Sequence, residues 1–254
     1  MKKFKNFINE EQELLLMGGQ SAERQETGFV NAINNTYQKV FQPINVNSKE
    51  LSIKNVMGAE KFSGRSIAGT EPYTDVIVTF LNKTKKNISM KGPTAPSLAG
   101  GGLAGIELVL PGIGKNFMAA ARKHLIAKGF KKGDKVPDVY AKLNDKDKLL
   151  LVIGNKSNGG PIDYMYIGPM DVISTTSGKT LSLNGALIDA TKYAKTHDLY
   201  FRLRARREDQ TFDPDAKDGK GIYNVYGKSP TRGDSKGRIV ITDKVPAARD
   251  IITF

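Results

Sequence analysis

The sequence predicts an α/β protein in which a central mixed sheet is flanked by helices and followed by a β-rich, basic C-terminal region. Three observations carry this prediction. Apolar residues recur at helical spacing over residues 21–41, residues 73–81 are rich in β-branched and aromatic types, and the last third holds several strand-like segments. The chain of 254 residues is long enough for one large domain or two small ones. A boundary near residue 135 is one option.

The first predicted element is a helix over residues 21–41. Phe29 and Ile33 lie four residues apart, and further apolar residues continue this spacing, which indicates a helix packed on a core. Ser21, followed by acidic residues, is typical of a helix N-cap. Pro43 is expected to end the helix.

A hairpin is predicted next, after a first strand at residues 51–57. Residues 73–81 and 87–91 are expected to pair through the polar turn at 82–86. Residues 92–105 then carry two Pro and five Gly, with few large side chains. We therefore expect a loop whose backbone is open to contact.

The rest of the chain continues this alternation of helices and strands. We expect strands at 106–110, 147–153 and 163–168, helices at 114–129 and from Asn184 to His197, and a strand-rich end at 199–207, 222–226 and 237–242.

Composition narrows the possible chemistry. The chain has no Cys and two His, at positions 124 and 197, so it lacks thiolate catalysis and Cys-ligated metals. Any metal would be held by oxygen atoms, which favours Mg²⁺, Mn²⁺ or Ca²⁺. The net charge of +13 attracts polyanions such as DNA. A merely soluble basic protein is the alternative, and no apolar run or signal sequence indicates a membrane role.

The predicted hairpin places a carboxylate and an ammonium group close together. Asp75 lies at the head of the first strand, and Ser89-Met90-Lys91 begins fourteen residues later on the second. On adjacent strands, Asp75 and Lys91 can face the same small volume. Hydrolysis of a phosphodiester needs a carboxylate for Mg²⁺ and a cation beside the attacking water. The main-chain carbonyl of Met90 is a candidate second metal ligand, and an ordinary hairpin with a surface Asp and Lys is the alternative.

These residues resemble the PD-(D/E)XK nuclease superfamily, the fold of many restriction endonucleases. Its signature is Pro-Asp, a hairpin of this length, and acid-x-Lys, with an upstream Glu on the first helix. The resemblance implies Asp75 as metal ligand, Lys91 as activator of the water, and Glu26 as helper, with Glu23 as second choice. It covers roughly residues 21–110 and implies a restriction-endonuclease-like core and Mg²⁺- or Mn²⁺-dependent cleavage of DNA.

One departure from the signature matters for activity. Ser89 stands where the family has an acid, as in a Ser-x-Lys variant followed by a loop of small residues. Ser is a poor Mg²⁺ ligand beside a carboxylate. The site therefore uses fewer acidic ligands, recruits Glu71 or Glu60, or is catalytically inactive. The expected organisation is a nuclease-like core over 11–135, continued by a β-rich basic region over 136–254.

Basic residues of the C-terminal region are candidate phosphate ligands. Arg202, Arg204 and Arg206 alternate along one strand, so all three are expected on one face. The alternative is a solvated face paired to Glu208 and Asp209. A Gly- and Lys-rich loop adds three further nucleic-acid-binding candidates, which are Arg232, Lys236 and Arg238.

The first ten residues form a separate motif. Phe4, Phe7 and Ile8 fall on one helical face among Lys residues, and Glu10 follows Ile8-Asn9. The segment resembles capsid-targeting peptides of head-internal proteins in large contractile-tailed bacteriophages, which a prohead protease cuts after such a Glu. The resemblance implies a mature chain that starts at Glu11 inside the virion head. A basic N-terminus that packs two Phe on the body is the alternative.

Three functions follow from these patterns. The first is a metal-dependent DNA endonuclease, phage-encoded, acting in the host cytoplasm or packaged in the virion head. The second is a non-enzymatic DNA-binding or virion-internal structural protein. The third is an inhibitor of host defence injected with the genome.

Overall fold

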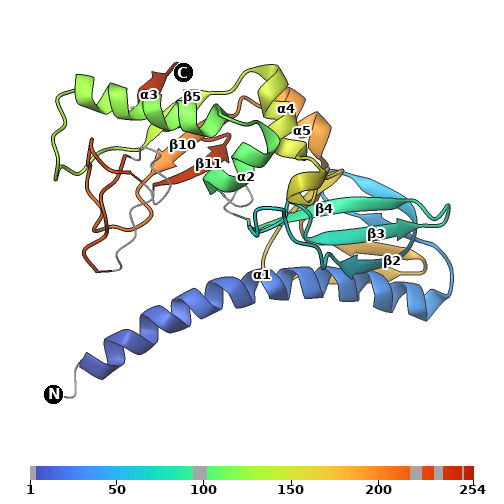
Figure 1. Cartoon of the computed structure of the whole chain (residues 1–254). Helices are drawn as coiled ribbons and strands as arrows, with labels where there is room; N and C mark the ends of the chain where they lie inside the picture. The colour runs from blue at the N-terminus through green and yellow to red at the C-terminus, as the bar shows by residue number, and fades with distance from the viewer. Residues whose placement is uncertain (1–3, 94–101, 218–224, 232–236, 248) are drawn as a thin grey trace. The chain divides into compact units, whose positions relative to one another are not determined.

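The chain folds into two units, shown in the computed structural model of Figure 1. The structure describes the main chain of residues 4–93, 102–217, 225–231, 237–247 and 249–254, with side chains from residue 22 onward. Unit 1 comprises Met1–Ser63, Thr74–Ala95 and Ile162–Ala190, and unit 2 comprises Gly64–Tyr73, Pro96–Pro161 and Thr191–Phe254. The units thus alternate along the chain instead of meeting at one boundary near residue 135.

Unit 1 is a long helix on a mixed sheet. The helix is α1 (Phe4–Val40), and the sheet has the strand order β7-β8-β1-β2-β3-β4-β6-β9. The strands are β1 (Ile44–Asn47), β2 (Ser52–Lys61), β3 (Val76–Phe80), β4 (Lys85–Lys91), β6 (Tyr164–Ile167), β7 (Ser174–Ser177), β8 (Thr180–Leu183) and β9 (Ala186–Asp189).

Both strand directions occur in this sheet. Strands β1, β2, β3 and β4 form an antiparallel meander, and β6 runs parallel to β4. Parallel neighbours need a crossover connection, and the chain between β4 and β6 passes through helices of unit 2. The sheet is therefore mixed, as the sequence predicted.

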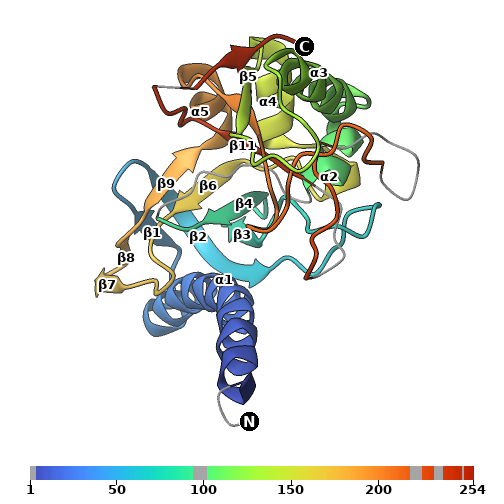
Figure 2. The ribbon, with the colours of Figure 1, turned by 90° about the vertical axis from the view of Figure 1, so that its left-hand side faces the viewer.

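The core of unit 1 lies between α1 and one face of the sheet (Figures 1 and 2). Phe29 and Ile33 of α1 are fully buried against Val76, Val78 and Ile88. Apolar residues four apart on the helix and two apart on the strands create these matching faces. Each such side chain contributes about 1.5–3 kcal/mol by leaving water.

Unit 2 has a smaller sheet of order β11-β10-β5-β12 and short helices. Its elements are α2 (Gly102–Val109), α3 (Ile113–Ala127), β5 (Val139–Lys142), α4 (Asp145–Ile153), a 3-10 turn η1 (Lys156–Asn158), α5 (Ala190–Thr196, whose first residue belongs to unit 1), β10 (Tyr200–Arg204), β11 (Arg238–Thr242) and β12 (Ile251–Ile252). Helix α3 packs on this sheet, where the rings of Phe117 and Phe201 stack with centroids 5.2 Å apart.

Several sequence predictions are confirmed. The hairpin is β3–β4, helix α3 matches residues 114–129, and β6 matches 163–168. Strands β10 and β11 lie within 199–207 and 237–242. Most of the segment 222–226 lies outside the described residues.

The start of the first helix was wrongly predicted. The main chain is helical from Phe4, so Ser21 lies inside α1 and is no N-cap. The Glu- and Leu-rich segment before Ser21 has high helix propensity and carries the helix through. Residues 4–10 of the predicted leader belong to this helix, and cleavage after Glu10 stays a prediction.

Two predicted strands and one predicted cap are also wrong. Residues 147–153 lie in α4, because Asn144 accepts a hydrogen bond from the N–H of Asp147 at 2.9 Å and caps a helix there. Residues 106–110 lie mainly in α2. Short apolar runs of this kind do not distinguish a strand from a buried helix. Asn184 precedes β9, and its Oδ1 accepts a hydrogen bond from the Tyr166 hydroxyl at 3.1 Å.

Among the residues that the structure describes, α1 and the shorter helices all lack an apolar stretch sufficient to cross a bilayer.

Candidate active site

Asp75 lies directly before β3 and binds the neighbouring strand β4. Its main-chain N–H donates to the carbonyl of Ile88 at 2.9 Å, which continues the β3–β4 ladder. Its carboxylate Oδ2 accepts hydrogen bonds from the Ser89 hydroxyl at 3.1 Å and from the Met90 N–H at 2.6 Å. The Asp75 carboxylate therefore binds two groups near the C-terminal end of β4, just before β3 begins.

The register places the candidate residues of the hairpin on one face. Val76 pairs with Ile88, and both belong to the core under α1. Successive side chains alternate between faces. Asp75 and Ser89 therefore point to the face away from α1, and Lys91, two residues beyond Ser89, shares that face. The structure thus brings Asp75 and Ser89 into contact and puts the half-buried Lys91 beside them on β4.

The upstream acid lies on the other side of the sheet. Glu26 of α1 forms an ion pair with Lys61, with 4.0 Å between Oε2 and Nζ. Lys61 pairs in register with Val76, so its side chain leaves the sheet on the α1 face. Glu26 is thus at the Asp75 end of the sheet but over the opposite face. The second choice, Glu23, pairs with the same Lys61 at 3.6 Å.

The substitute acids do not complete a carboxylate cluster within unit 1. Glu60 forms an exposed ion pair with Lys85 at 2.8 Å, and Glu71 belongs to unit 2. Within the described residues, no three or more His, Asp or Glu side chains converge on a common point. The main-chain N–H of Met90 donates to Asp75, whereas the metal ligand predicted at Met90 is its carbonyl. A Mg²⁺ ion at Asp75 would therefore be held by one carboxylate and by neutral oxygens.

Gln25 is a residue of this region that the sequence reasoning missed. Its side chain is 2% exposed, and its Nε2 donates to the carbonyls of Gly168 at 2.8 Å, Lys91 at 3.1 Å and Pro169 at 3.2 Å. It holds the ends of β4 and β6 to α1. The signal was present, because Gln25 lies four residues before Phe29 and is a polar residue at a core position of the helix.

The three arginines of the predicted row, Arg202, Arg204 and Arg206, differ in their surroundings. Arg202 binds Asp138, whose Oδ2 lies 2.7 Å from Nε and 2.6 Å from Nη2. Arg204 is half-buried on the same strand and faces Arg238 in register. Arg206 is exposed beyond the end of β10. Arg232 and Lys236 lie outside the described residues.

Asp209, one of the two acids considered as partners of this row, has other contacts. Asp209 Oδ2 accepts hydrogen bonds from Ser229 Oγ at 2.7 Å and Thr231 Oγ1 at 2.6 Å. Hydrogen bonds from Thr231 and then Ser229 lower the pKa of Asp209 to about 2. Asp209 thus holds a loop of unit 2.

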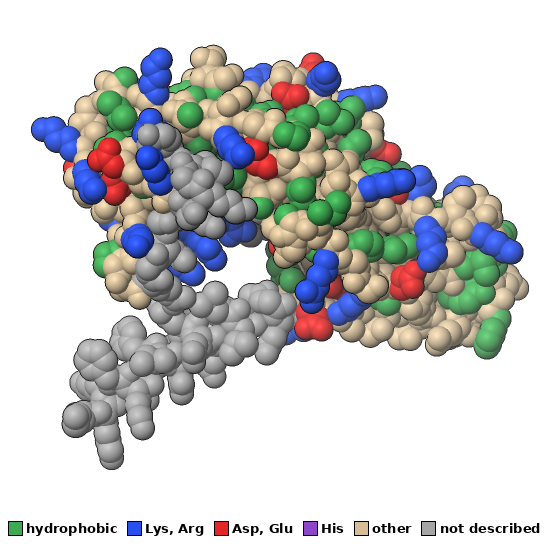
Figure 3. Space-filling model, in the orientation of Figure 1, with side chains coloured by type: hydrophobic (Ala, Val, Ile, Leu, Met, Phe, Trp, Pro, Cys, Tyr) green, Lys and Arg blue, Asp and Glu red, His purple; other side chains and the backbone are tan. Residues whose placement is uncertain are grey.

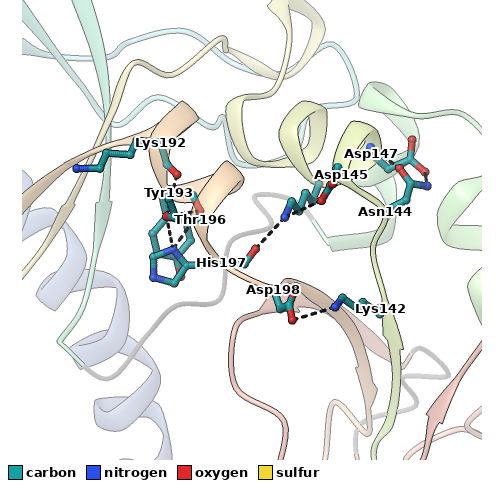
Figure 4. A network of polar contacts seen from close by, with 10 residues as sticks. Lys142, Asn144, Asp145, Asp147, Lys192, Tyr193, Thr196, His197 and Asp198 are labelled. Carbon is teal, nitrogen blue, oxygen red and sulfur yellow. Dashed lines mark hydrogen bonds and ion pairs between the residues drawn. The ribbon is translucent and has the colours of Figure 1, made fainter.

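A polar network around His197 has a structural role (Figure 4). The imidazole stacks on the Tyr193 ring, with centroids 4.1 Å apart and an interplanar angle of 21°. The carbonyl of His197 accepts a hydrogen bond from Lys148 Nζ at 3.1 Å, and this 5%-exposed ammonium also pairs with Asp145 at 2.9 Å. The network connects α4 to the end of α5 and neutralises the buried Lys148.

Comparison with known protein families, curated proteins and solved structures gives no match to this chain.

Proposed function

We propose that the protein is a metal-dependent DNA endonuclease whose site is built at the β3–β4 hairpin. The observation that carries the proposal is the contact of Asp75 with Ser89 at the head of this hairpin, with Lys91 next on the same face. The order of elements supports it. A long helix packed on a mixed sheet that contains the hairpin is compatible with the mixed sheet and flanking helices that the PD-(D/E)XK resemblance implies.

Each residue of the hairpin has a chemical task in this proposal. The Asp75 carboxylate would hold a divalent cation. The Lys91 ammonium stabilises negative charge on the attacking hydroxide and on the phosphate. Ser89 orients the carboxylate through its hydroxyl. When bound, Mg²⁺ supplies polarisation of the phosphate and acidification of a water molecule.

The charge of the chain fits a polyanionic substrate. Lys and Arg total 39 against 26 Asp and Glu, and Figure 3 shows Lys and Arg side chains over the surface of both units on the face displayed. A net positive field raises the rate of encounter with DNA and makes the affinity depend on salt.

A plasmid-nicking assay in Mg²⁺ tests the site. Asp75→Asn keeps an acceptor for the Met90 N–H but removes the charge, and Lys91→Met removes the ammonium. We expect each to lower cleavage by about 100-fold or more. Lys85→Met, a matched change at the exposed start of β4, is expected to cleave within about twofold of wild type. Equal cleavage by all four proteins would exclude this site.

A non-enzymatic DNA-binding protein is the second candidate. It is favoured by the position of Glu26, which pairs with Lys61 over the other face of the sheet instead of joining Asp75. In this case the wild type cleaves DNA in neither Mg²⁺ nor Mn²⁺, yet binds it with an affinity that falls steeply with salt.

We also propose that residues 1–10 are a packaging leader removed from the virion form. The support is the Ile8-Asn9-Glu10 sequence after a short basic aromatic segment. Mass spectrometry of the virion protein tests this proposal. A mature N-terminus at Glu11 supports packaging in a phage head, and an N-terminus at Met1 refutes it.

A further inference from the structure

Among the residues that the structure describes, one face of the small sheet in unit 2 holds more cations than acids. The face consists of Asp138 and Tyr140 around β5, Arg202 and Arg204 of β10, and Arg238 of β11, and we call it the arginine face. The register puts Tyr140 opposite Arg202 and Arg238 opposite Arg204. Three guanidinium groups thus share a surface with one carboxylate.

The carboxylate on this face, that of Asp138, already has a guanidinium partner. Asp138 binds Arg202 through two short contacts, at 2.7 and 2.6 Å. The Arg202 guanidinium also lies 6.0 Å from the centre of the Tyr140 ring. Arg202 is therefore held in place from two sides, and its charge is neutralised.

Arg204 differs from Arg202 in the hydrogen bonding of its guanidinium group. Its Nε is buried, and the structure gives this atom no hydrogen-bond partner among the described residues. Burial lowers the pKa of the Arg204 guanidinium, repulsion from Arg202 and Arg238 lowers it further, and attraction to Asp138 and Tyr140 offsets this only in part. Like charges directly opposite each other on neighbouring strands destabilise a sheet, and an uncompensated half-buried cation is costly. A bound anion would offset the repulsion between Arg204 and Arg238.

We propose that the arginine face is a phosphate-binding site, in which Arg204 and Arg238 bind the oxygens of one phosphate group and Arg202, fixed by Asp138, borders it. Planar guanidinium groups match the tetrahedral oxygens of phosphate in paired hydrogen bonds. The site lies in unit 2 and is distinct from the Asp75 hairpin of unit 1. The choice of a polynucleotide as source of the phosphate rests on the proposed function, whereas the anion site itself does not.

The test compares Arg204→Gln with Arg65→Gln, which removes the same charge from an exposed position of unit 2. Two probes are used, inorganic phosphate in thermal melts and a short labelled DNA duplex in anisotropy titrations at several salt concentrations. All measurements contain EDTA, so cleavage does not enter. We expect phosphate to raise the melting temperature of wild type and Arg65→Gln but not of Arg204→Gln.

For the duplex, Arg204→Gln is expected to lose about tenfold or more in affinity, because charge-assisted hydrogen bonds are lost. The slope of log affinity against log salt is expected to fall in magnitude by about 1. Arg204→Lys keeps the charge without the planar fork and is expected to lie between the two. Without anion, Arg204→Gln is expected to melt at or above the wild-type temperature, because a buried unpaired charge has been removed.

Wild-type behaviour of Arg204→Gln with both probes overturns the proposal. The proposal is also overturned if Arg204→Gln is less stable than wild type without anion while the salt slope of DNA binding is unchanged. That result would mean that Arg204 has a structural role. If Arg204→Gln is no longer stabilised by phosphate but binds DNA as tightly as wild type, the polynucleotide is refuted as ligand of this site and free phosphate remains. If the wild type binds DNA here but cleaves none in the separate plasmid-nicking assay with Mg²⁺ and Mn²⁺, the nuclease proposal is refuted and this site stands.

Discussion

Replacement of Gln25 by Met measures how strongly α1 holds the end of the sheet. The two side chains have similar length, but Met has no N–H to donate to the carbonyls of Lys91, Gly168 and Pro169. The amide has two protons, so about two hydrogen bonds are lost. At about 0.5–1.5 kcal/mol each, the free energy of unfolding of unit 1 is expected to fall by about 1–3 kcal/mol.

Hydrogen exchange is the suitable assay, because two units can unfold in separate transitions and a global melt would mix them. Amides in peptides that cover β4 and β6 are expected to exchange about 5- to 150-fold faster in Gln25→Met, as the loss of 1–3 kcal/mol requires. The control is Gln38→Met, the same substitution on an exposed position of α1. If β4 and β6 exchange at the same rate in the two variants, the three carbonyl contacts do not hold the sheet, and the reasoning is refuted.

Three other predictions concern stability. Asp75→Ala removes the charged acceptor of an N–H at 2.6 Å and is expected to destabilise unit 1 by about 1.5–3 kcal/mol, whereas Asp75→Asn, which keeps an acceptor, loses less in chemical denaturation followed by circular dichroism. Hydrogen bonds from Thr231 and Ser229 lower the pKa of Asp209 to about 2, below the unfolded value of about 3.9. The stability that Asp209 adds is therefore complete above pH ~4 and is lost as the pH falls toward 2. Exchange in the Thr231 loop should accelerate over that range in wild type but not in Asp209→Asn, and equal profiles would contradict this assignment. Gly154→Ala places a Cβ 2.6 Å from Cδ2 of Tyr73 at a φ of +71°, and a loss of about 1–3 kcal/mol is expected in thermal melts; an unchanged melting temperature would show that the turn can move.

Local sequence patterns were sufficient to predict those elements that bury one face in a single core. The spacing of Phe29 and Ile33 predicted the helix, and the β-branched run before a polar turn predicted the β3–β4 hairpin. The register of this hairpin puts Asp75, Ser89 and Lys91 on one face, whereas the hydrogen bond between Ser89 and Asp75 was not predicted. The period of side chains along a strand and the length of a turn are properties of the local chain.

Local patterns failed where the environment decided the structure. The apolar run at the end of α4 is compatible with a strand or a buried helix, and the cap at Asn144 with the surrounding packing selects the helix. The side of the sheet on which Glu26 lies depends on how α1 packs, which no spacing within the helix reveals. Gln25 gained its role from carbonyls more than 60 residues away along the chain.

The sequence by itself determined the class of the fold, the basic charge and the hairpin, because these depend on composition and on periods of a few residues. Tertiary structure alone decided which charges are compensated. Asp138 neutralises Arg202 and leaves Arg204 opposite Arg238, although the two arginines are alternate residues of one strand with the same chemistry. Whether a charge has a partner depends on strands brought together from distant segments, since electrostatic energy follows distance in space and not along the chain.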